Sequence, residues 1–207
     1  MKVTVLGYGN VGSAMIKQLG KAGHQVTVTG RDMDKAATVA HQFGAGAKAP
    51  AEAAGDAEAI LVAVPYGDAV TALKSLGDLN GKLIIDVTNP LTADYMGITV
   101  GFSSSAAEEI AKALPGAKVV KAFNTLFAQV MAEGGDFGGS KASAFFAGDD
   151  AQAKSAVQAL IESIGFAPVD AGGLKNARYL EPLAGLNIYL GYGAGLGTQI
   201  APTWLKR

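Results

Sequence analysis

Val3-Thr4-Val5-Leu6-Gly7-Tyr8-Gly9-Asn10-Val11-Gly12 is the stretch that decides the fold, since a β-branched run leads into a Gly-x-Gly-x-x-Gly pattern and a helical pattern follows at once. Glycines at this spacing, between a strand and a helix, are typical of a dinucleotide-binding turn. Gly7 would permit the tight turn, Gly9 the close approach of a pyrophosphate, and Gly12 close packing of the helix on the strand. Unpaired N–H groups near Asn10 would face the phosphates. The sequence therefore predicts a dinucleotide site formed by residues 7–12.

The end of the next strand, Val26-Thr27-Val28-Thr29, indicates which dinucleotide would bind. An NAD-preferring site has an acidic residue about 20 residues beyond the glycines, where it accepts a hydrogen bond from the ribose 2′-hydroxyl. Thr29 and Gly30 occupy that place here, and two cations, Arg31 and Lys35, follow. A guanidinium and an ammonium suit the negative charge of a 2′-phosphate. The pattern predicts NADP(H), bound in part by these four residues.

Asp32, directly after Arg31, admits two interpretations. It could be the ribose-binding acid in a displaced position. We favour a role as the N-cap of a helix over residues 33–43, because Asp is a preferred residue there. Arg31 and Lys35 could also be solvated surface cations without a ligand.

Composition describes a globular chain and excludes several classes of protein. The 207 residues, of which 49% are hydrophobic and 17% charged, suit one domain or one domain with an appendage. A formal net charge of −1 provides no field to attract nucleic acid. The chain has no cysteine and two histidines, so disulfides, thiolate catalysis and a histidine metal site are not expected.

The sequence also gives no sign of a membrane or secretory segment. No apolar run reaches the ~20 residues that span a bilayer. The chain opens with a strand pattern followed by glycines rather than with a charged, then apolar, leader. We expect a cytoplasmic protein with no membrane or nucleic-acid partner.

Strand and helix patterns alternate along the chain, which predicts an α/β fold with a doubly wound, mainly parallel, Rossmann-like sheet. Short apolar runs predict strands at residues 2–6, 26–29, 59–64, 83–87, 118–122, 143–147 and 167–170, and amphipathic stretches predict helices at about 11–22, 33–43, 67–76, 103–114 and 150–164.

The pattern changes after Lys175, which predicts a dinucleotide-binding domain over residues 1–175 and a small helical part over residues 176–207. A helix is expected from Ala177 to about Leu190. The glycines at 191, 193, 195 and 197 would end it unless another element packs tightly against them. The apolar helix could pack across a two-fold interface, which would make the protein a homodimer, or fold back on its own sheet.

Three predicted strands end in segments that should meet at one edge of the sheet, where ligands of open α/β sheets bind. Ala63-Val64-Pro65 would line the cofactor near the nicotinamide ribose. Asn89 is either a polar contact to the nicotinamide half or the start of an Asn-Pro turn. Ala122 and Asn124 end the third segment, and Asn124 either converges on the same cleft or caps a helix over residues 126–132.

No catalytic side chain and no metal site can be assembled from the sequence. Glu108-Glu109 and Asp149-Asp150 are adjacent pairs, and neighbouring side chains diverge on a helix. Asp149-Asp150 is better interpreted as the cap of a helix that starts near Ala151. We therefore expect the inferred cleft to hold no paired carboxylates, and the chemistry to belong to bound cofactors that the protein positions.

A wider set of motifs covers nearly all of the chain. Besides the glycine turn, it comprises Gly23-His24, Gly30-Arg31 with Lys35, Ala63-Val64-Pro65, Phe102-Ser103-Ser104-Ser105-Ala106-Ala107, Lys121-Ala122-Phe123-Asn124-Thr125, Gly148-Asp149-Asp150, Asp170-Ala171-Gly172-Gly173-Leu174 and Asn176-Ala177-Arg178-Tyr179-Leu180-Glu181. With these motifs the chain closely resembles the NADPH-dependent reductases of the deazaflavin coenzyme F420. The resemblance implies a Rossmann-like domain with a small C-terminal part and direct hydride transfer between NADPH and the deazaflavin. It also implies a deazaflavin pocket over the nicotinamide, formed partly by the C-terminal part and often by a dimer.

The chain departs from that family pattern at two positions. Members that handle F420 tend to carry a second arginine where this chain has Asp32, and a histidine where it has Asn124. Relatives with the same overall pattern, among them the cytosolic domains of membrane ferric reductases, work with flavins or metals instead.

The sequence therefore predicts an NADP-dependent oxidoreductase that transfers a hydride between NADP(H) and a flavin-like small-molecule acceptor, such as coenzyme F420 or a flavin. A reductase of another small substrate is a second interpretation, although the β-hydroxyacid and imino-acid reductases need a helical substrate domain of on the order of 100 residues. A third is a non-catalytic NADP(H)-binding redox sensor.

Overall fold

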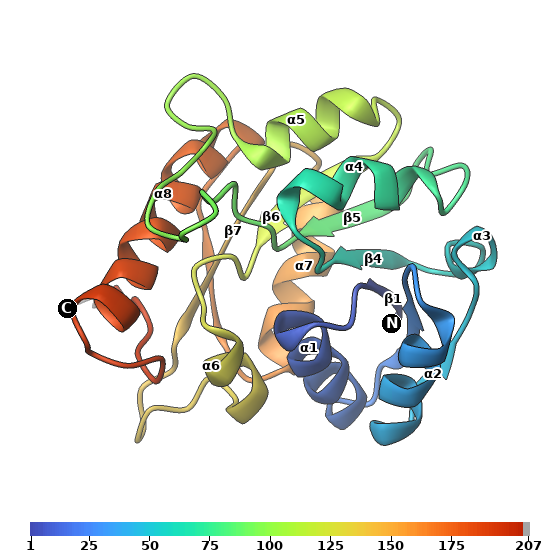
Figure 1. Cartoon of the computed structure of the whole chain (residues 1–207), viewed down its shortest axis with the longest axis horizontal. Coiled ribbons are helices and arrows are strands. Elements are labelled where there is room, and N and C mark those ends of the chain that lie inside the picture. The colour runs from blue at the N-terminus through green and yellow to red at the C-terminus, as the bar shows by residue number, and fades with distance from the viewer. Residues whose placement is uncertain (205–207) are drawn as a thin grey trace.

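The computed structural model describes residues 1–204 and contains one eight-stranded sheet with strand order β3-β2-β1-β4-β5-β6-β7-β8. All neighbouring strands are parallel except β6 and β7. The predicted α/β, doubly wound and mainly parallel fold is confirmed (Figure 1). The strands are β1 Lys2–Leu6, β2 Gln25–Thr29, β3 Gly46–Ala47, β4 Ala59–Val62, β5 Leu83–Asp86, β6 Lys118–Ala122, β7 Ser143–Gly148 and β8 Ala167–Asp170.

Helices cover both faces of the sheet, because alternate strand residues point to opposite sides. Val3 and Val5 of β1 join a core with the helices on one face, and Leu6 joins a core with those on the other. The first face carries α1 Asn10–Lys21, α2 Met33–Gln42, α6 Ala128–Glu133 and α7 Ala151–Ser163, and the second carries α3 Pro50–Ala53, α4 Tyr66–Lys74, α5 Ala106–Ala113 and the start of α8 Ala177–Ile188.

Side-chain caps fix where three helices begin. Asp32 Oδ1 accepts the N–H of Lys35 (3.2 Å) at the start of α2. Asp150 Oδ1 accepts the N–H of Ala153 (2.8 Å) at the start of α7. Both caps are confirmed as predicted. Ser105 caps α5 in the same way, which starts that helix at Ala106 rather than at the predicted residue 103.

The C-terminal helix folds back on the sheet of its own chain, which is one of the two predicted arrangements. Leu180 of α8 packs on Phe145 and Ala147 of β7. After α8 the chain continues as a π-helix, Tyr189–Gly193, through the first glycines. A Cβ on Gly191 would lie 2.5 Å from Phe127 Cζ, so close packing explains why this position is a glycine.

Two short elements escaped the prediction. β3 is two residues long and α3 is four residues long, too short for either to show a periodic pattern. Within the described residues, no helix is both long and apolar enough to cross a membrane.

Candidate functional site

The glycine turn between β1 and α1 has the geometry that the sequence predicts. Gly7 has a φ of +107°, and a Cβ there would collide with the Ala63 carbonyl oxygen. A Cβ on Gly12 would collide with the Gly7 carbonyl oxygen, so this glycine lets α1 approach the turn. A Cβ on Gly9 would meet no atom of the described chain within 4 Å. The space above Gly9 is therefore open to a ligand.

The N-terminus of α1 faces this open space with free N–H groups. Gly9 is the N-cap residue, and no side chain in the described structure caps the helix. The N–H of Ser13 bonds to the Gly9 carbonyl oxygen, so the N–H groups of Asn10, Val11 and Gly12 precede the first intrahelical bond. The first turn carries no acidic residue. This arrangement suits an anion such as a pyrophosphate.

A first hollow of about 530 Å³ opens beside the turn, at the ends of β1, β2 and β4. The Tyr8 ring lies across Gly30, where a Cβ would be only 2.6 Å from Tyr8 Cε1, and the Tyr8 hydroxyl accepts the N–H of Asp32 (3.1 Å). The hollow is lined by Leu6, Gly7, Tyr8, Gly9, Gly30, Arg31, Pro50, Ala63, Val64, Pro65, Asp68, Thr71, Ala72 and Ser75.

Eight of the predicted residues line this first hollow, whereas Thr29, Lys35 and the α1 residues 10–12 do not. Thr29 is fully buried, and its carbonyl oxygen accepts the N–H of Gly7 (3.0 Å), so it holds the turn rather than lining the hollow. Lys35 is exposed, and its Nζ lies 3.1 Å from Asp32 Oδ2. The pKa of Asp32 lies below its ordinary value because the carboxylate accepts hydrogen bonds from the Lys35 backbone and side chain.

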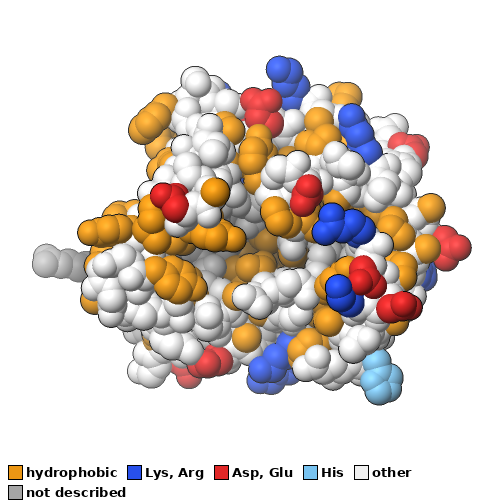
Figure 2. All heavy atoms as spheres, viewed as in Figure 1, with side chains coloured by type: hydrophobic (Ala, Val, Ile, Leu, Met, Phe, Trp, Pro, Cys, Tyr) orange, Lys and Arg blue, Asp and Glu red, His pale blue; other side chains and the backbone are white. Residues whose placement is uncertain are grey.

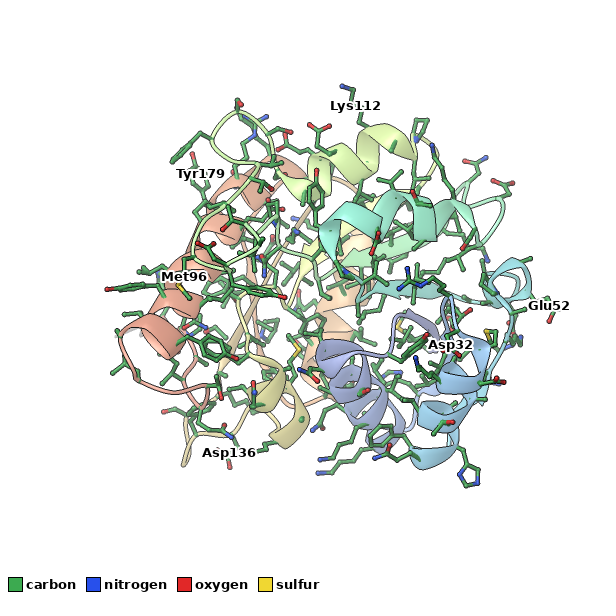
Figure 3. The ribbon with its side chains drawn as sticks, viewed as in Figure 1. Asp32, Glu52, Met96, Lys112, Asp136 and Tyr179 are labelled. Carbon is green, nitrogen blue, oxygen red and sulfur yellow. The ribbon has the colours of Figure 1, made fainter. Side chains whose placement is uncertain are left out.

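A second hollow of about 600 Å³ lies on the other side of Asn10, between the ends of β5 and β6 and the helix α8. Hydrophobic side chains gather around it in Figure 2, whereas charged side chains gather toward α2. Figure 3 shows Met96 beside α8 and Asp32 beside α2, on opposite sides of the turn. The lining residues are Asn10, Val11, Asn89, Leu91, Asp94, Tyr95, Met96, Asn124, Thr125, Leu126, Phe127, Ala128, Gln129, Ala184, Asn187, Ile188 and Tyr192.

Asn89 and Asn124 form a reciprocal pair in the wall of this second hollow. Asn89 Nδ2 donates to the Asn124 carbonyl oxygen (2.9 Å), and Asn124 Nδ2 donates to Asn89 Oδ1 (2.9 Å). Asn124 Nδ2 also donates to the Leu180 carbonyl oxygen (3.0 Å). Phe123, with a φ of +61°, makes the sharp turn that leads into Asn124. Two strand ends and α8 are thus joined through one side-chain amide.

Two polar atoms in the same wall are buried without a hydrogen-bond partner. Among the described residues, Asn124 Oδ1 and Thr125 Oγ1 have none. A buried polar atom without a partner is costly, so such atoms mark a place where a ligand or an ordered water completes the site. Asn124 does not cap a helix, because the N-cap of α6 is Phe127. Ala122 is fully buried in β6 and does not line the hollow.

Three charged side chains, which the sequence did not predict to meet, are fully buried beside the second hollow and are not among the residues that line it. Lys121 Nζ lies 2.7 Å from Asp86 Oδ2 and 2.8 Å from Glu181 Oε1, and it donates to the Thr88 carbonyl oxygen (2.7 Å). The three residues are far apart in the sequence, so no local spacing pairs them. Their signal is a charge inside an otherwise apolar strand or helix, at Ile85-Asp86-Val87, Val120-Lys121-Ala122 and Leu180-Glu181.

Burial and charge oppose each other in this cluster. Burial alone would lower the pKa of Lys121, but the negative charges of Asp86 and Glu181 outweigh it and hold the pKa above its ordinary value. Burial raises the pKa of the Glu181 carboxyl, against the ion pair with Lys121 and the hydrogen bond from the N–H of Ala106.

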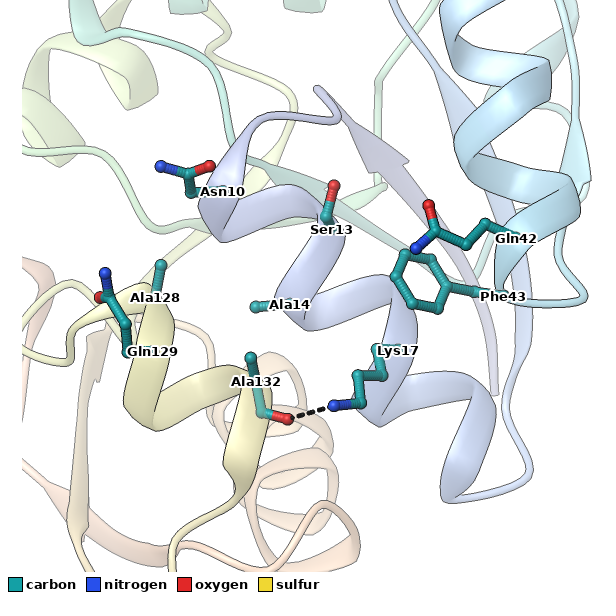
Figure 4. Close-up of a pocket in the computed structure, with 9 residues that line it drawn as sticks. All are labelled: Asn10, Ser13, Ala14, Lys17, Gln42, Phe43, Ala128, Gln129 and Ala132. Atoms are coloured by element: carbon teal, nitrogen blue, oxygen red, sulfur yellow. Dashed lines mark hydrogen bonds between the residues drawn. The ribbon is translucent and has the colours of Figure 1, made fainter. Parts of the chain in front are cut away.

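A third hollow, of about 480 Å³, lies between α1 and α6 and is shown in Figure 4. Lys17 Nζ crosses it to donate to the Ala132 carbonyl oxygen (2.9 Å). It shares Asn10, Ala128 and Gln129 with the second hollow, and its lining contains no glycine of the turn and no strand-end asparagine. We assign no ligand to it.

The predicted site residues therefore gather around one helix N-terminus. Gly7, Tyr8, Gly9, Gly30, Arg31, Ala63, Val64 and Pro65 line the first hollow, and Asn10, Val11, Asn89 and Asn124 line the second. The sequence did not predict the cluster of Asp86, Lys121 and Glu181, nor Asn187, which donates from Nδ2 to the Thr125 carbonyl oxygen (3.0 Å).

Comparisons with known proteins show which family the chain resembles. The family model described as "NADP oxidoreductase coenzyme F420-dependent" matches residues 2–90. An F420-dependent NADP reductase from Methanothermobacter marburgensis is 32% identical, over 92% of this chain and 92% of that protein. The crystal structure of a candidate F420-dependent NADP-reductase from Arthrobacter sp. FB24 superposes with a TM-score of 0.90 at 31% identity, over 100% of both chains.

A third relative is much longer than this chain. Metalloreductase STEAP3 of Rattus norvegicus is 32% identical over 183 residues, which is 88% of this chain but 36% of that protein. The chain thus spans about a third of that relative's length.

Proposed function

The chain belongs to the family of F420-dependent NADP oxidoreductases, as its motifs predicted, and from this premise we propose that it transfers a hydride between NADP(H) and a planar, flavin-like acceptor. The observation that carries the proposal is the pair of hollows on either side of the uncapped N-terminus of α1. A dinucleotide has two halves joined by a pyrophosphate, and this site has two hollows joined by a phosphate-binding turn.

The first hollow would hold the adenosine half. The N–H groups of residues 10–12 and the open space above Gly9 suit the pyrophosphate. Arg31 lines this hollow and carries the positive charge that a 2′-phosphate requires. Lys35 would contribute less, because it is already paired with Asp32.

The second hollow would hold the nicotinamide half. Asn124 Oδ1 is buried and lacks a donor in the described chain, so it suits the N–H of a carboxamide. Bound there, NADPH would supply a hydride from its nicotinamide ring to an acceptor atom held about 3–3.5 Å away. Asn89 and Asn124 would orient the ring rather than transfer a proton.

The acceptor would lie over the nicotinamide ring, against the outer part of the same hollow. Leu91, Tyr95, Met96 and Tyr192 give this part an apolar, aromatic lining. Asp94 is the ionisable carboxyl there, and its pKa lies below its ordinary value because its carboxylate accepts hydrogen bonds from Thr92 and Met96. A lining that holds a flat ring without a dedicated proton donor fits a flavin or a deazaflavin.

The C-terminal part would contribute to acceptor binding, since Ala184, Asn187 and Tyr192 line the second hollow. We keep the homodimer as a prediction of the sequence. Tyr189 and Leu186 are about half exposed, at 54% each, and are the positions where aspartate substitutions would test it by sedimentation.

The test is oxidation of stereospecifically deuterated NADPH, with coenzyme F420, FMN or FAD as the hydride acceptor and, separately, with a ferric chelate as a one-electron acceptor. We expect a primary isotope effect on the rate with a flavin-like acceptor. Deuterium should be retained at C5 of a reduced deazaflavin, whereas a flavin accepts the hydride at N5, where the deuterium exchanges with water. NADPH binding without turnover of any acceptor would favour a redox sensor. A rate loss of about a thousandfold or more on Tyr179→Phe would reveal a dedicated proton donor and contradict the proposed role of the asparagines.

A further inference from the structure

The proposed function leaves three buried charges without a role: Asp86 at the end of β5, Lys121 in β6 and Glu181 in α8 (Figure 1). All three are fully buried. Taking charges out of water costs several kcal/mol per ion, and apolar side chains of similar size often stabilise a fold as well or better. Stability alone is therefore a weak reason for this cluster.

The contacts of the cluster lead to the asparagine pair from both sides. Lys121 Nζ donates to the Thr88 carbonyl oxygen (2.7 Å), and Asp86 Oδ1 accepts the N–H of Thr88 (2.9 Å). Thr88 directly precedes Asn89 in the chain. The cluster thus fixes the backbone from which the Asn89 side chain projects.

Glu181 fixes the backbone that holds the other asparagine, Asn124. Its carboxylate accepts the N–H groups of Ala106 (2.9 Å) and Ala107 (3.3 Å) and pairs with Lys121 (2.8 Å). The residue before it, Leu180, accepts the Nδ2 of Asn124 through its carbonyl oxygen (3.0 Å). Each asparagine is therefore held through a residue that adjoins or belongs to the cluster.

We propose that Lys121, together with Asp86 and Glu181, is a positioning group that holds Asn89 and Asn124 in the orientation that keeps Asn124 Oδ1 without a protein partner, in the wall that would face the nicotinamide half of NADP(H). The inference rests on the proposed function and adds to it the residues that orient the nicotinamide side of the site. It assigns Lys121 no contact with the cofactor.

A second ion pair makes it possible to distinguish this positioning role from a role in merely attaching α8 to the rest of the fold. Arg178 Nη2 and Nε donate to the two carboxylate oxygens of Glu108, at 2.7 and 2.8 Å, and so also join α8 to α5. That pair is partly exposed, with 24% and 22% of the two side chains accessible. Neither residue lines the second hollow. It offers a matched control between the same two helices.

The experiment compares binding of NADPH with binding of 2′,5′-ADP, which lacks the nicotinamide half, by titration calorimetry on the full chain. Lys121→Met alone leaves two carboxylates facing each other and is expected to lower the denaturation midpoint. The double variant Lys121→Met/Glu181→Gln removes one charge of each sign, leaves Asp86 as the one remaining carboxylate of the cluster, and is expected to recover part of the midpoint. In the double variant we expect the Kd for NADPH to rise about tenfold, and the Kd for 2′,5′-ADP to change by less than about twofold.

The control variant Glu108→Gln/Arg178→Met should keep both Kd values within about twofold of the wild type. An unchanged Kd for NADPH in the Lys121→Met/Glu181→Gln variant, or an equal loss for both ligands, would overturn the positioning role. If the wild type binds NADPH no more tightly than 2′,5′-ADP, the second hollow does not hold the nicotinamide half, and the proposed function fails before the variants are considered.

Discussion

The first hollow is built from residues 6–75, mostly from backbone at a glycine turn and from exposed side chains. The second hollow draws on four separate segments, and its polar groups are buried amides tied to one another and to an ion cluster. In the first hollow, the groups that a ligand would contact point into solvent and are already free. The second depends on groups whose orientation is set by contacts across the sheet.

This difference predicts how each side responds to substitution. A change in the first hollow should remove one contact and leave the rest of the molecule alone. A substitution in the second hollow should affect several residues at once, because its residues share hydrogen-bond partners. The effects of substituting such neighbours do not simply add.

The largest effect is expected at the turn itself. Gly9→Ala would place a methyl group in the space where the pyrophosphate approaches, because no atom of residues 1–204 lies within 4 Å of that position. Loss of the charge-assisted hydrogen bonds to the N-terminus of α1 should weaken NADPH binding by about a hundredfold or more. Calorimetric titration of NADPH measures it.

The fold of this variant should be intact, since Gly9 has a φ of −70°, which alanine adopts without strain. Gly20→Ala is the matched control in the same helix, because a Cβ there would lie at an ordinary 3.6 Å from the Phe43 carbonyl oxygen. A Gly9→Ala protein that binds NADPH like the Gly20→Ala protein would show that the turn has only a structural role.

The next effect separates NADP from NAD. Arg31→Ala should weaken NADPH binding by about 1.5–3 kcal/mol, a tenfold to hundredfold change, by removing a charged contact to the 2′-phosphate. NADH binding should stay the same, because NADH lacks that phosphate. Parallel titrations of the wild type and the variant with NADPH and NADH measure this preference. Equal affinities for the two cofactors in the wild type would rule out the assignment of NADP.

The first hollow was predictable from the sequence because its determinants are local. Gly7, Gly9 and Gly12 lie within one turn and carry their backbone geometry with them. The capping role of Asp32 was equally readable, since capping depends on the residues that follow directly. The positions of the longer strands and helices also followed from periodic patterns.

The second hollow was predictable only in outline. Asn89 and Asn124 were expected at one sheet edge, but their mutual hydrogen bonds depend on the turn at Phe123 and on α8. The Lys121 cluster unites residues from positions 86, 121 and 181, and nothing in their local sequences pairs them. A charge inside an apolar strand shows that a partner must exist without showing which one.

A smaller effect tests the asparagine pair directly. Asn124→Ala removes Oδ1, which has no hydrogen-bond partner among the described residues, and the hydrogen bonds that Nδ2 donates to Asn89 and Leu180. We expect the rate of hydride transfer to fall about tenfold, as the loss of one neutral hydrogen bond to the ligand would cause. Single-turnover kinetics with saturating NADPH measures this rate. A change in the pH–rate profile would contradict a purely orienting role, because an amide does not titrate.

The smallest effect is a gain of affinity at Asp32. Asp32 follows Arg31 in the chain, and its carboxylate pairs with Lys35 at 3.1 Å. The pKa of Asp32 lies below its ordinary value because of hydrogen bonds from the Lys35 backbone and side chain. The carboxylate therefore stays negative at neutral pH, where it would repel a 2′-phosphate and occupy one of the nearby cations.

Asp32→Asn keeps a side chain that caps α2 well and removes the charge. Exposed charges in water interact by about 0.2–1 kcal/mol, so NADPH affinity should rise up to about fivefold. NADH affinity should not change, and the gain should shrink at high salt because the interaction is screened. A loss of NADPH affinity in Asp32→Asn would show instead that Asp32 binds the ribose, as the alternative interpretation of the sequence holds.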